Sequence, residues 1–170
     1  MNGFTEIPVS ALGNAQEMIG KDMMLISVSS REKLNLMTAS WGCMGVLWNK
    51  NVAVCFVRES RYTYELLKEQ NRFSLAFFGG ERRDVLAYCG RVSGRDNDKL
   101  GQMGLHSVEL DGILSVAEAE TVIICRKLYS DMINENGFID KDIYKNSYGK
   151  GDLHRVYVCE IEKVYRKNEE

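Results

Sequence analysis

The stretch Asn51–Lys68, "NVAVCFVRESRYTYELLK", contains the junction on which the fold of this chain depends. Its first seven residues are apolar on both alternating faces, which is typical of a strand buried on both sides. From Ser60 onward the pattern becomes helical, with Tyr64 and Leu67 on one face. The stretch therefore predicts a buried strand that ends near Val57 and passes directly into a helix.

Cationic and hydroxyl side chains gather at this junction. Arg58 would emerge where the strand ends, and Ser60 sits where a helix N-cap belongs. The free N–H groups and the dipole of a first helical turn attract anions, and a phosphate accepts many hydrogen bonds at once. Two interpretations are open: a phosphate site formed by Arg58, Ser60, Arg61, Tyr62 and Thr63, or an ordinary helix start with two solvated arginines.

The rest of the chain has the pattern of a mainly β protein. Short runs rich in β-branched and aromatic residues predict strands, and breaker clusters such as "WNKN" and "GGERRD" separate them. The predicted strands cover residues 23–30, 35–42, 44–48, 51–57, 72–78, 120–129 and 154–165. Their spacing is typical of a β-barrel or a β-sandwich.

Helices are predicted as insertions between these strands, at residues 60–71, at residues 81–92 and in a short segment from Asp96. The "NG" at Asn136–Gly137 fits a hairpin turn, but residues 138–152 lack clean alternation, which favours an irregular excursion. No βαβ alternation is visible. A β-barrel with helical insertions is therefore favoured over a doubly wound parallel sheet.

The composition indicates one ordinary globular domain, residues 1–170, with 45% hydrophobic and 27% charged residues. A net charge of -2 argues against a broad nucleic-acid or anionic-membrane surface, since both need a positive excess. No apolar run is long enough to span a bilayer. The first residues lack the basic start and apolar core of a signal peptide, so we expect a cytoplasmic protein.

The cysteines and histidines do not form a recognisable metal or redox motif. Five cysteines, an odd number, lie mostly in apolar runs without C-x-x-C spacing, which predicts buried reduced thiols. The two histidines, His106 and His154, have no ligand-type spacing. We expect no metal site.

Two other segments have polar groups suited to a ligand. In "RVSGRDNDKL" (residues 91–100) a Ser-Gly step allows close backbone approach, and Lys99 adds a positive charge. In "NLMTASWG" (residues 35–42) polar residues and Trp41 share a strand that ends in glycine, as expected beside a polar, aromatic-walled cavity. A simple turn in the first segment and a core position for Trp41 are the alternatives.

Taken in order, "NLMTASWG", "RESRYT", "SGRDNDK" and "GDLHRVYVCEI" resemble the flavin reductase-like, FMN-binding split-barrel family, above all its flavoredoxin-like branch. The resemblance covers roughly residues 20–165. It implies a split barrel, bound FMN, and a homodimer with flavin at or near the subunit interface. One departure is Cys159, which stands where many members have glycine before Glu-Ile.

The resemblance also implies roles for individual residues, motif by motif. The first motif would lie along the flavin ring and ribityl chain: Asn35, Met37, Thr38, Ala39, Ser40 and Trp41. The second would hold the phosphate: Arg58, Ser60, Arg61, Tyr62 and Thr63. The third would contact ribityl or phosphate: Ser93, Gly94 and Lys99. The fourth contributes His154, a candidate catalytic residue, and Tyr157.

A flavin performs hydride and electron chemistry itself, while the protein supplies position and electrostatics. The chain has neither G-x-G-x-x-G nor a Walker loop, so NADH or NADPH would have to stack on the flavin. We expect an FMN-dependent oxidoreductase of the flavin reductase class that passes electrons from NAD(P)H to free flavin or another acceptor. The alternatives are an FMN-bound electron carrier reduced by a protein partner, and a non-catalytic barrel that binds a phosphorylated ligand.

Overall fold

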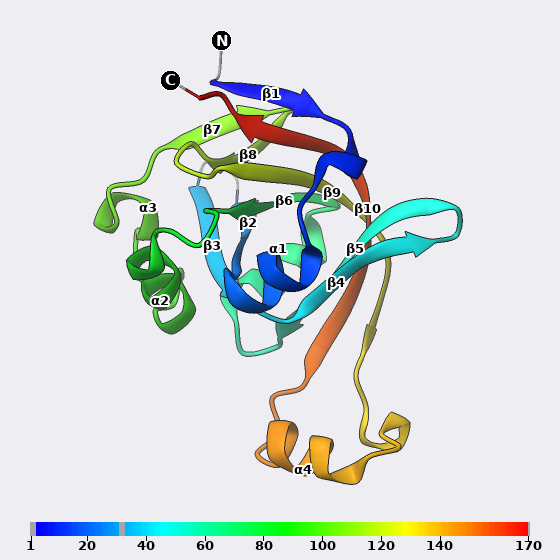
Figure 1. Cartoon of the computed structure of the whole chain (residues 1–170). Helices are drawn as coiled ribbons and strands as arrows, with labels where there is room; N and C mark the ends of the chain where they lie inside the picture. The colour runs from blue at the N-terminus through cyan, green and yellow to red at the C-terminus, as the bar shows by residue number, and fades with distance from the viewer. Residues whose placement is uncertain (1–2, 31–32, 170) are drawn as a thin grey trace.

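The computed structural model describes residues 3–30 and 33–169. Within these residues eight strands form one antiparallel sheet that curls into an open barrel (Figure 1), in the order β3-β2-β6-β9-β10-β5-β4, with β1 paired to β10. The strands of this sheet are β1 (Phe4–Ile7), β2 (Met24–Ser30), β3 (Lys33–Ala39), β4 (Gly42–Leu47), β5 (Lys50–Arg58), β6 (Arg72–Phe77), β9 (Thr121–Met132) and β10 (His154–Lys167). A separate hairpin consists of β7 (Ser107–Leu110) and β8 (Ile113–Val116).

The helices are inserted between strands, as the sequence predicts. They are α1 (Tyr62–Glu69), α2 (Arg83–Arg91), α3 (Lys99–Gln102) and α4 (Lys141–Tyr148), with short helical turns η1 (Val9–Ala11), η2 (Glu17–Lys21) and η3 (Glu135–Gly137). Residues 133–153, which include η3 and α4 and connect β9 to β10, stand out from the barrel (Figure 1). We call this segment the α4 arm.

The core consists of two apolar clusters on opposite faces of the central strands. Ile123 and Cys125 of β9 belong to the cluster that also contains Leu67 of α1. Val122 and Ile124 belong to the other cluster, which lies against α2 and the β7–β8 hairpin. Because successive strand residues point to opposite faces, this part of β9 is buried on both sides.

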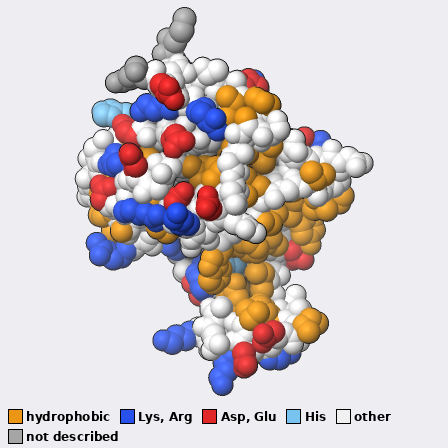
Figure 2. Space-filling view, in the orientation of Figure 1, with side chains coloured by type: hydrophobic (Ala, Val, Ile, Leu, Met, Phe, Trp, Pro, Cys, Tyr) orange, Lys and Arg blue, Asp and Glu red, His pale blue; other side chains and the backbone are white. Residues whose placement is uncertain are grey.

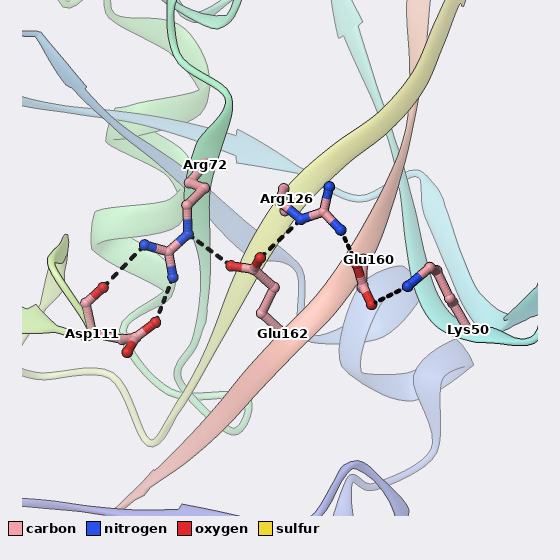
Figure 3. A network of polar contacts seen from close by, with 6 residues as sticks. All are labelled: Lys50, Arg72, Asp111, Arg126, Glu160 and Glu162. Atoms are coloured by element: carbon pink, nitrogen blue, oxygen red, sulfur yellow. Dashed lines mark hydrogen bonds and ion pairs between the residues drawn. The ribbon is translucent and has the colours of Figure 1, made fainter.

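Where the sheet is not covered by helices, a chain of alternating charges crosses four neighbouring strands (Figure 3). Arg72 Nε and Arg126 Nε lie 2.7 Å and 2.9 Å from Glu162, and Lys50 lies 2.7 Å from Glu160. The full network contains Lys50, Arg72, Asp111, Arg126, Glu160 and Glu162. Single exposed ion pairs stabilise a protein by at most about 1 kcal/mol, but opposite charges on facing strands favour this register over a slipped one.

The structure confirms the predicted strands and the two longer predicted helices. It also confirms the excursion at residues 138–152 over a hairpin, although the excursion contains the unpredicted helix α4. Strands β1, β7 and β8 were not predicted. The helix expected from Asp96 begins three residues later, at Lys99, because Asp98 accepts a hydrogen bond from the Gly101 amide and acts as its N-cap.

Two predictions about burial need correction. Strand β5 is not buried on both sides: Val54 and Phe56 are half-buried, and Phe56 lines a cavity described below. Four cysteines are buried, including Cys159, but Cys43 is exposed. In the part of the chain that the structure describes, no helix is long and apolar enough to cross a membrane.

Candidate functional site

Two neighbouring cavities collect the side chains that the sequence analysis singled out. The aromatic cavity, about 180 Å³, is lined by Met37, Thr38, Ala39, Ser40, Trp41, Phe56, Arg58, Arg61 and His154. The cationic cavity, about 220 Å³, is lined by Asn35, Ser60, Arg61, Tyr62, Thr63, Arg91, Val92, Ser93, Gly94, Arg95 and Lys99. Arg61 lines both. Every predicted cofactor residue therefore borders one cavity or the other.

The aromatic cavity lies where β3 and β5 meet the start of β10. Register places His154 opposite Arg58 on the neighbouring strand. Trp41 follows the end of β3, and its side chain remains 48% exposed. The ring centroids of Trp41 and Phe56 lie 5.2 Å and 6.3 Å from that of His154. The cavity thus offers a broad aromatic wall at the edge of the barrel.

His154 is a neutral side chain in this environment. It is 8% exposed, and its Nδ1 lies 2.8 Å from the hydroxyl of Tyr148 in the α4 arm. Burial, followed by the nearby positive charge of Arg58, lowers the His154 pKa to about 4. At neutral pH the ring therefore carries no charge and can donate from only one nitrogen.

The cationic cavity contains two buried or half-buried cations, Lys99 and Arg61, which form no ion pair with a carboxylate among the described residues. Lys99, 4% exposed, donates from Nζ to the backbone oxygens of Leu36 at 2.7 Å and Cys89 at 3.1 Å. Arg61 donates to the same Cys89 oxygen at 3.1 Å. Desolvation lowers the pKa of Lys99 to about 8 and also lowers the pKa of Arg61. An anion in this cavity would favour the charged form of Lys99 and raise its pKa.

Asn35 and Gly94 bring the segments 35–42, 58–63 and 93–99 into contact beside the cationic cavity. Asn35 Nδ2 donates to Thr63 Oγ1 at 2.8 Å, which ties β3 to α1. Its Oδ1 is buried without a hydrogen-bond partner among the described residues. A Cβ at position 94 would lie 2.0 Å from that oxygen, so only glycine fits there. Ligand sites often contain a buried acceptor without a protein partner, and often contain a glycine that lets the backbone come close to the ligand.

The strand-to-helix junction differs from its prediction. Ser60 is not the N-cap of α1: the helix begins at Tyr62, and Arg61 is the capping residue without a side-chain cap bond. The Ser60 amide and hydroxyl instead bond to the Asp152 carboxylate of the α4 arm, at 3.1 Å and 2.8 Å. A carboxylate of the chain itself therefore occupies these two donors.

Arg58 also faces the α4 arm. Its guanidinium donates to the backbone oxygens of Asp152 at 2.6 Å and Ser147 at 3.3 Å. It lines the aromatic cavity and not the cationic one. Arg58 nevertheless lies 3.8 Å from the Asp152 carboxylate oxygen that the Ser60 hydroxyl binds, so the two side chains approach the same anionic group. Their grouping at a single phosphate position stays a prediction.

The two other residues considered in the sequence lie elsewhere. Tyr157, paired with His154 in the fourth motif, is buried in the core, and desolvation raises its pKa. His106 is exposed and lies 2.7 Å from Glu118. Among the residues with described positions, no cluster of three or more His, Cys, Asp or Glu side chains is placed to hold a metal ion.

Sequence reasoning missed six residues at the site: Phe56, Arg91, Val92, Arg95, Tyr148 and Asp152. The first four belong to quoted segments, and their proximity to the other motif residues was the available signal. Tyr148 and Asp152 lie in the α4 arm, where no local pattern indicates contact with residues about 90 positions earlier.

Comparison with known proteins identifies the family of the chain. Residues 18–170 match the family described as "Flavin reductase like domain". No curated protein matches the chain. A similar solved structure is a flavoredoxin from Methanosarcina acetivorans, with 24% identity and a TM-score of 0.64, covering 88% of this chain and 69% of that chain.

Two further solved structures share the fold at lower identity. An FMN-binding domain of a flavin reductases-like enzyme from Shewanella baltica OS155 has 16% identity and a TM-score of 0.68, covering 96% of this chain and 77% of that chain. A Streptomyces globisporus NADH:FAD oxidoreductase in complex with NAD and FAD fragments has 14% identity and a TM-score of 0.62, covering 85% and 74%. With most of its length matched and the same architecture, the chain belongs to the flavin reductase-like domain family and has its split-barrel fold.

Proposed function

We propose that the chain, as a single domain, binds FMN across the two cavities and acts as an oxidoreductase of the flavin reductase class. In this role it passes electrons from NADH or NADPH to free flavin or another acceptor. The observation that carries the proposal is Arg61, which joins an aromatic-walled cavity to a cavity rich in cations. Such a pair of connected sites suits a planar ring linked to a phosphate. When bound, FMN supplies the hydride and electron chemistry.

The phosphate end fits the cationic cavity. Lys99 and Arg61 rest on backbone carbonyls, which hydrogen-bond a cation but do not neutralise it. A dianion beside them adds a charge-assisted interaction that is strong because the site is partly desolvated. Ser93 and Arg91 border the same cavity and supply further donors. Ser60 contributes less, because Asp152 already holds its amide and hydroxyl.

The ring end fits the aromatic cavity. Residues 37–41 form one wall as β3 ends, and the exposed side of Trp41 offers a surface for stacking. Ser40 and Trp41 lie between β3 and β4, outside both strands. We propose that backbone amides at residues 40–42 hydrogen-bond the polar edge of the ring, where fixed donors stabilise negative charge on a reduced flavin.

A homodimer is part of the proposal. Figure 2 shows hydrophobic side chains gathered over the β4–β5 hairpin and along the neck of the α4 arm. The large exposed hydrophobic residues include Trp41, Val46, Leu47, Trp48 and Tyr129. Contiguous exposed apolar surface of this kind marks a protein interface. It borders the aromatic cavity through Trp41, as expected if a second copy covers the flavin.

The second candidate is an FMN-bound electron carrier that a protein partner reduces. The same exposed apolar surface beside Trp41 favours it, because a redox partner would dock close to the ring. Both candidates use one flavin site and differ in the electron donor.

The test first records the absorption spectrum of the purified protein after addition of FMN. The flavin-loaded protein is then mixed with NADH or with NADPH in a stopped-flow instrument, and flavin absorbance is followed. Rapid bleaching of flavin absorbance supports the reductase, and a flavin-loaded protein that neither nicotinamide reduces supports the carrier. Arg61→Gln is expected to weaken FMN binding at least tenfold. Arg83→Gln is the matched control, because Arg83 lines neither cavity. A wild-type protein that takes up no FMN contradicts both candidates.

A further inference from the structure

A buried polar contact joins the α4 arm to the aromatic cavity. The Tyr148 hydroxyl lies 2.8 Å from His154 Nδ1, and the two side chains are 4% and 8% exposed. The arm is fastened there by Arg58, whose guanidinium bonds to two backbone oxygens of the arm and lies 5.4 Å from the Tyr148 ring centroid. The Tyr148–His154 contact is therefore part of a fixed junction rather than a chance approach of surface groups.

The chemistry of the two groups sets the direction of this hydrogen bond. A buried phenol hydroxyl is costly unless its proton has an acceptor, and His154 Nδ1 lies within bonding distance of it. A neutral imidazole accepts at Nδ1 only when its hydrogen is on Nε2. The bond made by one ring nitrogen thus determines the state of the other.

Packing then determines which edge of the ring faces the cavity. His154 lines the aromatic cavity, whereas Tyr148 does not. Trp41 and Phe56 contact the imidazole ring from β3 and β5, and the Tyr148 ring meets it edge-on at 85° with a centroid separation of 5.6 Å. Because Nδ1 bonds to Tyr148 in the α4 arm and His154 lines the cavity, we infer that the Nε2 side of the ring faces the cavity.

We propose that Tyr148 is a positioning residue that holds His154 as an Nε2–H donor directed into the aromatic cavity. The donor would bind a carbonyl or carboxamide oxygen of the flavin, or of the molecule that exchanges electrons with it. This inference rests on the proposed function. It requires no proton transfer: His154 orients an acceptor oxygen and stays neutral.

The first test reads the tautomer directly, by ¹⁵N NMR of the histidine side chains in the protein without added nicotinamide. The chain has two histidines, and a His106→Asn variant assigns the His154 signals. The expected result is the Nε2–H tautomer in the wild type and a mixture of both tautomers in Tyr148→Phe, which keeps the ring contacts. A wild-type Nδ1–H tautomer, or an unchanged tautomer in Tyr148→Phe, overturns the proposal.

The second test measures whether the donor reaches a ligand. Tyr148→Phe is expected to weaken either FMN binding to the apoprotein or the apparent binding of NADH in stopped-flow reduction by about five- to tenfold. In a His154→Gln background, where an amide N–H replaces the imidazole donor, Tyr148→Phe is expected to have no further effect. Unchanged binding of both FMN and NADH in Tyr148→Phe overturns the proposal.

The two tests also separate this inference from the proposed function. A wild-type protein that binds no FMN contradicts the proposed function and, with it, the role given to His154. The NMR result still decides the hydrogen-bond direction between Tyr148 and His154 in that case. A wild-type protein that binds FMN but fails the Tyr148→Phe tests contradicts the inference alone.

Discussion

At the scale of single residues, the properties of the site come from groups whose environment differs from water. Lys99 is the clearest case, because burial lowers its pKa to about 8 while its hydrogen bonds go to neutral carbonyls. His154 is neutral for a similar reason. Both groups show that desolvation, more than formal charge, sets the electrostatics of the two cavities.

The lowered pKa of Lys99 predicts a pH-dependent affinity for FMN. The free protein loses the Lys99 proton as pH rises through about 8, and a neutral amine attracts a phosphate less. We expect the FMN dissociation constant to rise between pH 7 and pH 9.5 in fluorescence titrations. Riboflavin, which has no phosphate, should show little of this dependence. The Lys99→Gln variant should bind FMN more weakly, and its dissociation constant should not change over this pH range. If the pH dependence persists in the variant, another group causes it.

The Asp152 carboxylate predicts a second effect on phosphate affinity. It accepts a hydrogen bond from the hydroxyl of Ser60, which lines the cationic cavity, and it therefore repels an incoming dianion. Asp152→Asn removes that charge with little change in shape, so FMN should bind about 1.4- to fivefold more tightly, as expected for roughly 0.2–1 kcal/mol at a solvent-exposed site. Calorimetric titration with FMN and with riboflavin checks this. An equal gain for riboflavin would show that charge is not the cause.

At the scale of elements, periodicity predicted most of the fold. The apolar and helical patterns on either side of Arg58 located β5 and α1, because burial in each element repeats at a local period. The missed β7–β8 hairpin had a signal: "VELDGILSV" places Asp111–Gly112 between apolar runs, and both residues have positive φ. The four-residue strand β1 had none, since its pairing with β10 joins opposite ends of the chain.

Helix α1 packs its apolar face against the barrel. Removing a large side chain from that face is therefore expected to lower the stability of the protein. Leu67 is fully buried in the cluster that also contains Ile123 and Cys125. Leu67→Ala should lower the free energy of unfolding by about 2–5 kcal/mol, from lost burial and the remaining cavity. Urea denaturation measures this, with Ile143→Ala, at a 52% exposed position, as the control. Equal losses in both variants would contradict the burial of Leu67.

At the scale of the whole molecule, the β4–β5 hairpin exposes an apolar surface to solvent. Val46 and Trp48 are 74% and 56% exposed, and Trp48 meets Tyr129 of β9 edge-on. The charge network of Figure 3, in contrast, gives the part of the sheet that no helix covers a polar outer surface. One sheet thus presents a polar region and an apolar region, which is typical of a subunit with one docking surface.

If this surface forms the homodimer, charges placed on it should separate the subunits. Val46→Glu with Trp48→Glu is expected to convert a dimer to a monomer in analytical ultracentrifugation, while circular dichroism shows an unchanged fold. Ile139→Glu, at a 98% exposed position in the α4 arm, is the matched control. A wild-type protein that sediments as a monomer contradicts the dimer and leaves a redox partner as the occupant of this surface.

The mainly β fold, the inserted helices and most residues of the two cavities can be predicted from the sequence, because these depend on local periodicity and on motifs whose members are near one another in the chain. The distribution of these residues between the two cavities comes from the folded structure. The antiparallel register that sets His154 opposite Arg58 brings the α4 arm onto the junction, so that Asp152 reaches Ser60 and the Tyr148 ring centroid lies 5.4 Å from the Arg58 guanidinium. Such contacts depend on the pairing of strands far apart in the chain, and no local pattern encodes that register.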